Sequence, residues 1–351
     1  MMPVTQRDIA DEVGVSVNTV SVVLRDAHAP LIGEKTRQRI LETARKLGYR
    51  PNPHARALAG AQAPLVKLSF EPTNDYISNR KATVLINALR RLERDVTIAD
   101  DIPRDEPDAA VEMLAWGSPE AVVFLHLASP VDVIVRLVEG LQEEGIYTLI
   151  ADLYEELGED VPCDAVRLDR YGGARRAVDH LIELGHRQIG LITCDMYRGR
   201  QKAYNDALQE AGVPERYIAH IDMPRSVTHD PQVDFTRQAM EQTTDLLSEN
   251  PEITALVCPS DMAALGSIKA CHTIGLKVPG DISLIGFHND PWTQFINVPL
   301  TTMAEPVEEI CTMCFDLISA RFHDDEGPWK RKTANYRLVE RASTAPPGGA
   351  R

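Results

Sequence analysis

The stretch Val4-Thr-Gln-Arg-Asp-Ile-Ala-Asp-Glu-Val-Gly-Val-Ser-Val-Asn-Thr-Val-Ser21 contains the signals of two short helices joined by a tight turn. Thr5 and Asp8 have the spacing of a capping box, which predicts a helix that begins just after Thr5. Gly14 predicts the turn, because glycine readily adopts the left-handed conformation that ends a helix, and Ser16 can cap the second helix. Two short helices around a glycine turn are typical of a helix-turn-helix. The stretch therefore predicts a module that binds DNA.

The residues that follow extend this head. A third helix is predicted from about Glu34, with an apolar face that can close a small core. Asn52 and Pro53 then carry the signals of a helix N-terminus, and Gly60 can end the short helix that they begin. A helix over 53–59 is shorter than the ~12 residues that a helix needs for stability alone in water. It therefore needs an external partner, unless the segment is an ordinary linker.

Charge is distributed unevenly along the 351 residues, whose formal net charge is −15. Residues 1–60 contain nine Lys or Arg against six Asp or Glu, whereas the rest of the chain contains 28 against 46. The molecule as a whole therefore repels nucleic acid, but its head does not. A basic head on an acidic body is expected of a nucleic-acid-binding module joined to a domain with another task.

From Leu65 to about Val339, short apolar runs alternate with helical stretches. The clearest apolar runs, which predict buried strands, are 120–125, 146–151, 188–193, 254–258 and 282–286. Glycines predict where helices end before a strand, at Gly145, Gly185, Gly212 and Gly275. This alternation predicts an α/β body of parallel sheets with helices on both faces. The body is too long for one ordinary sheet, so we expect two lobes that meet near residue 165.

The motifs of several other protein classes are missing. The sequence contains no glycine-rich phosphate loop, no nucleophile elbow and no zinc-protease motif, so we expect neither an enzyme nor a cofactor or metal. Cys311-Thr-Met-Cys314 has a metal-like spacing, but it lies on an apolar helix stripe, which favours two buried thiols. No apolar run reaches the ~18 residues of a membrane span, and the N-terminus has no secretion signal. We therefore expect a cytoplasmic protein without a membrane partner.

The head stretch resembles the LacI/GalR (lactose-repressor-type) family of transcription regulators. The resemblance continues over nearly the whole chain, through Thr36-Arg-Gln-Arg-Ile-Leu41, Leu47-Gly-Tyr-Arg-Pro-Asn-Pro-His-Ala-Arg-Ala-Leu58, Leu181-Ile-Glu-Leu-Gly-His-Arg-Gln-Ile-Gly190, Val278-Pro-Gly-Asp-Ile-Ser-Leu-Ile-Gly-Phe287 and Pro299-Leu-Thr-Thr302. It implies a homodimeric repressor that binds a palindromic operator and is controlled by a small effector bound between two lobes. The alternative is a solute-binding protein of the same body fold without a regulatory role, which the DNA-binding head and the missing secretion signal disfavour.

The resemblance also implies a division of the chain. Residues 1–50 form the helix-turn-helix head, 51–62 a hinge helix and linker, and 63–343 a body like the periplasmic sugar-binding proteins, which serves effector binding and dimerisation. The chain crosses between the lobes of such a body three times. The predicted lobes are about 65–162 with 300–324, and about 163–299 with 330–343. The tail, 344–351, is expected to be disordered because of its composition.

The head supplies the candidate DNA contacts. A helix from near Ser16 presents Val17, Asn18 and Val22 to the major groove, where asparagine pairs with adenine and valine contacts the thymine methyl group, unless the two valines belong to the core. The resemblance implies an arginine at position 22, which Val22 replaces, and it aligns Leu58 with a leucine that wedges into the minor groove. The predicted DNA-binding residues, including hydroxyls for phosphates, are Thr5, Ser16, Val17, Asn18, Thr19, Ser21, Val22, Asn52, His54, Arg56 and Leu58.

The resemblance also implies an effector site between the lobes. Its predicted residues are Arg80, Lys81, Asp152, Arg200, Ser260, Asp261 and His288. Arg200 matches the pocket arginine of the family, whereas Ser260 and His288 replace an amide and a carboxylate that grip sugar hydroxyls. Arg80 and Lys81 replace a Pro-Phe pair. Because charge-assisted hydrogen bonds are stronger than neutral ones, the added cations favour an anionic sugar derivative, unless Arg80 and Lys81 only form a solvated helix N-terminus.

Overall fold

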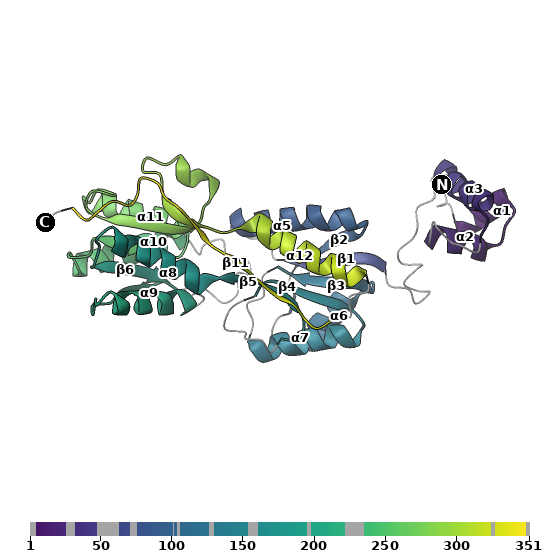
Figure 1. Ribbon diagram of the computed structural model, residues 1–351, viewed down its shortest axis with the longest axis horizontal. Helices are drawn as coiled ribbons and strands as arrows, with labels where there is room; N and C mark the ends of the chain where they lie inside the picture. Colours follow the sequence, from purple (N-terminus) through teal and green to yellow (C-terminus); the bar gives the residue numbers. More distant parts are fainter. Residues whose placement is uncertain are drawn as a thin grey trace. The chain divides into compact units, whose positions relative to one another are not determined.

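The computed structural model describes residues 5–25, 32–47, 63–70, 76–100, 102–103, 106–125, 130–153, 161–194, 198–221, 235–323 and 327–348. The chain forms two compact units, the head within residues 1–63 and the body within residues 64–351 (Figure 1). None of the helices in the described ranges is long and apolar enough to cross a membrane.

The head contains the three predicted helices, α1 (Gln6–Val13), α2 (Val17–Arg25) and α3 (Glu34–Leu47). The capping box is present: the Thr5 backbone N–H donates to Asp8 Oδ2 at 2.7 Å, and the Asp8 N–H donates to Thr5 Oγ1 at 3.4 Å. Gly14 ends α1 in the left-handed conformation with φ of 73°. The three helices enclose one small core, made of Ile9, Ala10, Val13, Val20, Val23, Ile40 and Ala44. The predicted hinge helix lies outside the described residues.

The first lobe of the body is built on a six-stranded sheet with the order β11-β5-β4-β3-β1-β2. Its strands are β1 (Ala63–Ser69), β2 (Asp95–Ala99), β3 (Pro119–Phe124), β4 (Tyr147–Leu153), β5 (Asp164–Asp169) and β11 (Arg331–Asn335). Two helices pack on each face of this sheet (Figure 1). One face is covered by α5 (Tyr76–Leu89) and α12 (Val307–Phe322), and the other by α6 (Pro107–Ala115) and α7 (Val131–Glu143). A short 3-10 helix, η1 (Arg90–Leu92), follows α5.

The second lobe repeats this layered arrangement around a sheet with the order β12-β10-β9-β8-β6-β7. Its strands are β6 (Ile189–Thr193), β7 (Tyr217–His220), β8 (Ala255–Val257), β9 (Ser283–His288), β10 (Thr301–Ala304) and β12 (Arg337–Val339). Only β12 runs antiparallel among the paired strands described here. The helices are α8 (Arg170–Glu183) and α9 (Arg198–Glu210) on one face, and α10 (Phe235–Glu249) and α11 (Asp261–Thr273) on the other. The 3-10 helix η4 (Pro291–Gln294) follows β9.

The predicted local signals of the body correspond to observed elements. Each of the five apolar runs contains or overlaps a buried strand. The four glycines predicted to end helices all have positive φ angles, 71° at Gly145, 101° at Gly185, 69° at Gly212 and 83° at Gly275. The α/β class and the two lobes of mainly parallel sheets are therefore confirmed.

The chain crosses between the lobes three times, but not where the sequence predicted. The crossings lie between β5 and α8, between β10 and α12, and between β11 and β12. The structure thus places the strands 164–169 and 331–335 in the first lobe and the strand 301–304 in the second, whereas each was expected in the opposite lobe. A short buried strand carries no local mark of the sheet it joins, because its partners are distant in sequence.

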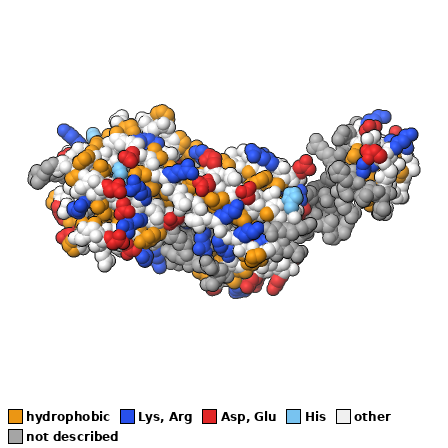
Figure 2. Space-filling model, in the orientation of Figure 1, with side chains coloured by type: hydrophobic (Ala, Val, Ile, Leu, Met, Phe, Trp, Pro, Cys, Tyr) orange, Lys and Arg blue, Asp and Glu red, His pale blue; other side chains and the backbone are white. Residues whose placement is uncertain are grey.

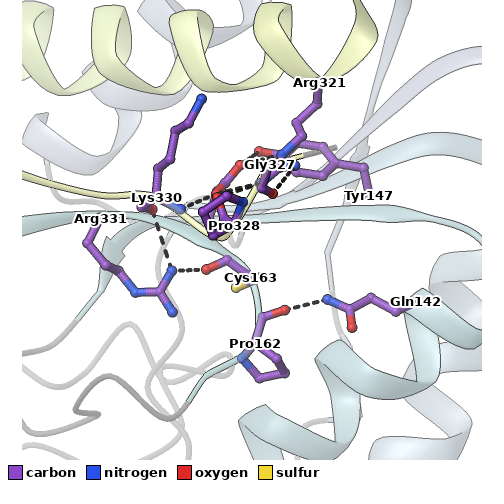
Figure 3. A network of polar contacts seen from close by, with 10 residues as sticks. Gln142, Tyr147, Pro162, Cys163, Arg321, Gly327, Pro328, Lys330 and Arg331 are labelled. Atoms are coloured by element: carbon purple, nitrogen blue, oxygen red, sulfur yellow. Dashed lines mark hydrogen bonds and ion pairs between the residues drawn. The ribbon is translucent and has the colours of Figure 1, made fainter. Parts of the chain in front are cut away.

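A polar network explains why β11 joins the first sheet (Figure 3). The buried carboxylate of Asp164, at the start of β5, accepts hydrogen bonds from the Lys330 N–H at 2.5 Å and from Tyr147 Oη at 2.7 Å. Arg321 Nε of α12 donates to the same carboxylate at 3.0 Å. Arg331 donates to the carbonyl oxygen of Cys163. These contacts hold β11, the last strand before the chain crosses to β12 of the second lobe, against β5.

The prediction that the tail is disordered from Thr344 is wrong for residues 344–348. The Ala345 N–H donates to Ser283 Oγ at 3.0 Å, and the Ala345 carbonyl oxygen lies 2.8 Å from His186 Nε2. Ser343 is fully buried, and its carbonyl oxygen accepts from the Leu284 N–H at 2.8 Å. Buried polar groups of β9 and of His186 need these partners, so they outweigh the disorder-prone composition of the segment.

His186 is a neutral, buried imidazole in this network. Because the carbonyl oxygen of Ala345 can only accept, Nε2 carries the hydrogen, and Nδ1, at 2.8 Å from Thr254 Oγ1, is the acceptor. Burial lowers the pKa of His186 below its ordinary value of 6.5. Below pH 6.5 the imidazole of His186 is protonated in the unfolded chain more readily than in the folded state. Acidification therefore lowers the free energy of unfolding.

We predict that His186→Gln flattens the dependence of the free energy of unfolding on pH between pH 7 and 5. The slope changes by at most about 1.4 kcal/mol per pH unit, the limit for one linked proton. Urea unfolding at several pH values measures it. The control is His272→Gln, because His272 is exposed at the end of α11, and it should keep the wild-type slope. Parallel curves for wild type and His186→Gln would contradict the prediction.

Candidate functional site

The outer surface of α2 carries the candidate base-reading residues. The side chain of Val17 is 42% exposed and Asn18 is exposed, whereas Val20 and Val23 are buried in the head core. Val22 is half-buried. One face of α2 therefore packs into the head core, and the residues at its N-terminus face outward. A recognition helix presents its N-terminal residues to base edges.

The predicted phosphate-binding hydroxyls of Thr5, Ser16 and Thr19 lie at helix N-termini, whereas Ser21 is half-buried in the middle of α2. Ser16 Oγ accepts from the Thr19 N–H at 3.0 Å and lies 2.8 Å from Thr19 Oγ1, so Ser16 caps α2. Thr5 caps α1 in the same way, and its N–H and hydroxyl lower the pKa of Asp8. Exposed helix N-termini attract phosphate groups. The exposed cations of the described head are Arg7, Lys35, Arg39 and Lys46. The predicted contacts Asn52, His54, Arg56 and Leu58 lie outside the described residues.

In the body, four charged side chains form a buried cluster, which we call the junction quartet: Lys81, Asp152, Arg170 and Glu305. Lys81 Nζ lies 2.7 Å from Asp152 Oδ2 and 2.8 Å from Glu305 Oε1. Arg170 donates to Asp152 Oδ1 at 2.5 Å. Each of the four residues is at most 9% exposed. Two cations and two carboxylates thus balance one another where solvent is excluded.

Lys81 is therefore not part of a solvated helix N-terminus. Burial alone lowers the pKa of its ammonium group, but the carboxylates of Asp152 and Glu305 outweigh this effect and hold the pKa well above its ordinary value. The neighbouring Arg80 is partly exposed and forms an ion pair with Glu308 of α12. Carboxylates of this chain thus neutralise both added cations. Arg80 and Lys81 therefore do not favour an anionic effector over a neutral one.

Arg200 of α9 is buried against two aromatic rings. Its guanidinium group lies 4.0 Å from the ring centroid of Phe287 and donates to Tyr336 Oη at 3.0 Å. It also donates to the carbonyl oxygen of Pro259 at 2.5 Å. Such stacking and a rigid fork of donors hold an arginine in one orientation. Arg200 is thus a fixed cationic group on the second lobe.

Ser260 and Asp261 have structural tasks in the second lobe. Ser260 caps α11, because its Oγ accepts from the Ala263 N–H at 3.1 Å. Asp261 is fully buried; its carboxylate accepts from the Asp290 N–H at 2.7 Å and from Thr302 Oγ1 at 2.6 Å. His288 is half-buried at the end of β9, with φ of 103°. These predicted effector residues lie at one end of the second sheet.

The sequence did not reveal that Glu305 pairs with Lys81, that Arg170 pairs with Asp152 or that Tyr336 accepts from Arg200. Glu305 and Tyr336 each lie at a crossing between the lobes, and Arg170 begins the helix after another crossing. The crossings were predicted at other positions, so no local pattern marked these residues. The CxxC spacing behaves as expected, since Cys311 and Cys314 are both buried free thiols. No group of three or more potential metal ligands occurs among the described residues.

Asp261 makes a second pH-dependent contribution, of opposite sign to that of His186. Burial raises the pKa of its carboxyl group from 3.8 to about 7. The folded state therefore keeps a proton that the unfolded chain releases above pH 4, so this contribution to stability is lost as pH rises toward 7.

We predict that Asp261→Asn is destabilised relative to wild type at pH 5 and gains on wild type as pH rises to 8. Between pH 5 and pH 8 the change is about 2.7 kcal/mol, because the folded carboxyl group keeps its proton over about two of these pH units and each unit corresponds to 1.36 kcal/mol. Denaturant unfolding across this pH range tests it, with Asp245→Asn on α10 of the same lobe as the control, because Asp245 is exposed. A constant difference between the two proteins at all pH values would refute the assignment.

In comparisons with known proteins, the head and the body each match a different protein family. The family described as "Bacterial regulatory proteins, lacI family" matches residues 5–52, and the "Periplasmic binding protein-like domain" matches residues 178–344. A transcriptional repressor, PurR of Proteus mirabilis, is 28% identical, with 97% of each chain covered. The structure of a Lac repressor dimer bound to operator has a TM-score of 0.79 at 22% identity and covers 98% of this chain and 100% of that one.

A further relative has a higher sequence identity to this chain than PurR of Proteus mirabilis has. It is an uncharacterized helix-turn-helix transcriptional regulator from the aml 5′ region of Streptomyces limosus, 31% identical over 97% of this chain and 95% of its own length. Together with the match of the head, this similarity extends over both units of the chain. The protein is therefore a member of the lacI family of bacterial regulatory proteins.

Proposed function

We propose that this protein is a sequence-specific transcription repressor that binds a palindromic operator as a homodimer and responds to a small effector bound between the lobes of its body. The observation that carries the proposal is the capped helix α2, which keeps Val20 and Val23 inward and turns Val17 and Asn18 outward. Binding to an operator places the protein in the cytoplasm, and we assign it no catalytic activity.

The charge distribution supports a division of labour between the two units. Acidic and basic side chains are interspersed over the face of the body that Figure 2 shows, whereas residues 1–60 have an excess of Lys and Arg. Phosphate contacts supply most of the sequence-independent affinity of DNA-binding proteins. The head is therefore the unit that engages DNA, and the hinge residues Asn52, His54, Arg56 and Leu58 are its proposed minor-groove contacts.

Relatives support the effector part of the proposal. Solved structures of similar fold include a CelR–cellobiose complex, with a TM-score of 0.67, and a LacI-family regulator from Enterococcus faecium with bound ribose, with a TM-score of 0.65. Arg200, His288 and the residues near Ser260 are the proposed contacts on the second lobe. Because the charges of Arg80 and Lys81 are balanced within the chain, we propose a small polar effector for which a negative charge is not required.

We predict that the purified protein binds an inverted repeat as a dimer and that its affinity falls steeply with salt. The logarithm of the binding constant should fall linearly with the logarithm of salt concentration, with a slope of about −0.9 for each phosphate neutralised. Gel shift with the DNA upstream of its own gene, combined with footprinting, measures both. Protection of an asymmetric site by a monomer, or binding that salt leaves unchanged, would contradict the proposed function.

We also predict that Val22→Arg shifts the preferred operator toward guanine at one position of each half-site. Arginine can form two hydrogen bonds with guanine, worth ~1–3 kcal/mol of discrimination. Selection of binding sites from random DNA compares the variant with wild type. Glu12→Arg is the control, because it changes the charge of an exposed site on α1 and should raise affinity without changing the motif. If Val22→Arg selects the wild-type motif, position 22 does not face the bases.

A further inference from the structure

The junction quartet connects segments on both sides of two crossings. Lys81 lies on α5 and Asp152 at the end of β4, so both belong to the first lobe. Arg170 is the first residue of α8, directly after the crossing from β5. Glu305 follows β10, on the crossing to α12. The ion pairs of Asp152 with Arg170 and of Lys81 with Glu305 therefore tie the first lobe to the two segments that lead into and out of the second.

The third crossing is held beside the quartet by Tyr336. Its ring packs against the hydrophobic cores of both lobes and meets the ring of Phe287 edge-on, with centroids 5.4 Å apart. Gly173 of α8 lies so close that an added Cβ would stand 2.4 Å from Cδ2 of Tyr336. Tyr336 Oη accepts from Arg200. The side chains that fasten the three crossings are thus buried at the quartet and partly buried at Tyr336.

The quartet resists separation of the lobes for an electrostatic reason. Removing one member of a buried ion pair leaves its partner as an uncompensated buried charge, which is strongly unfavourable, whereas removing both members is often nearly neutral. A rotation that carried Arg170 away from Asp152 would unbalance the cluster in the same way as a single substitution. The relative orientation of the lobes in which all four charges are matched is therefore favoured over orientations that part them.

We propose that the junction quartet is a latch that holds the two lobes in one relative orientation without a bound effector, with Lys81 as its central member. Domains that close around a ligand are held together by that ligand; here, two ion pairs of the chain itself bridge the lobes. An effector then acts by loosening an orientation that already exists. The proposal does not rest on the DNA-binding function.

Pulsed electron paramagnetic resonance, which measures the distance between two spin labels, tests the latch directly. The labels are attached to Glu139→Cys on α7 and Gln209→Cys on α9, which are exposed positions on different lobes. All six native cysteines are buried, so the two introduced thiols react preferentially. The distance distribution of the labelled full-length protein, measured without added small molecules, then reports the relative orientation of the lobes.

Three variants separate the latch from general stability. Lys81→Met removes the central charge. The double variant Lys81→Met/Glu305→Gln removes one cation and one carboxylate, so the cluster stays neutral and the protein should melt close to wild type. Asp164→Asn is the matched control, because Asp164 is an equally buried carboxylate whose partners Tyr147, Arg321 and Lys330 all lie within the first lobe.

We expect one narrow distance distribution for wild type and for Asp164→Asn, and a broadened distribution or a second distance for both Lys81 variants. The double variant is decisive, because it folds with little loss of stability and yet lacks the bridge to the second crossing. An unchanged narrow distribution in the double variant would overturn the proposal, as would a broad distribution in wild type. Loss of DNA binding in any of these proteins has no bearing on this readout.

Discussion

A buried carboxylate must be matched by positive charge, and the body of this protein is arranged around that requirement at Asp152. The carboxylate lies at the end of β4, where it receives both Lys81 and Arg170. Because desolvated charge is costly unless it is paired, α5, the start of α8 and the crossing that carries Glu305 must all approach this point. The packing of the lobes against one another follows from the same contacts that neutralise the site.

The head illustrates how far local sequence signals reach. The capping box at Thr5 and Asp8, the glycine turn at Gly14 and the Ser16 cap all appear in the structure with the predicted geometry. Each of these signals acts within four residues, and the core of the head needs only three helices that are close in sequence. In the body, helix-ending glycines and apolar runs were predictable for the same reason.

What could not be predicted depends on contacts between distant residues. The membership of β5, β10 and β11 in one sheet or the other depends on pairing with strands far away in sequence, and the segment after Ser343 is ordered by hydrogen bonds to His186 and Ser283. The roles of Lys81 and Asp261 were missed for a related reason. A charged residue at a family's ligand position looks the same in the sequence whether it meets a ligand or a partner in its own chain.

The three crossings have a consequence for the order in which the chain can fold during synthesis. Domains that are continuous in sequence fold one after another as they leave the ribosome. Here, the first lobe lacks α12 and its edge strand β11 until nearly the whole second lobe has been made, and the second lobe still awaits β12 and Ala345. Both lobes are therefore completed by the same last stretch of chain. A premature stop codon before the end of β11 would leave two unfinished lobes rather than one, and only the head would have been able to fold beforehand.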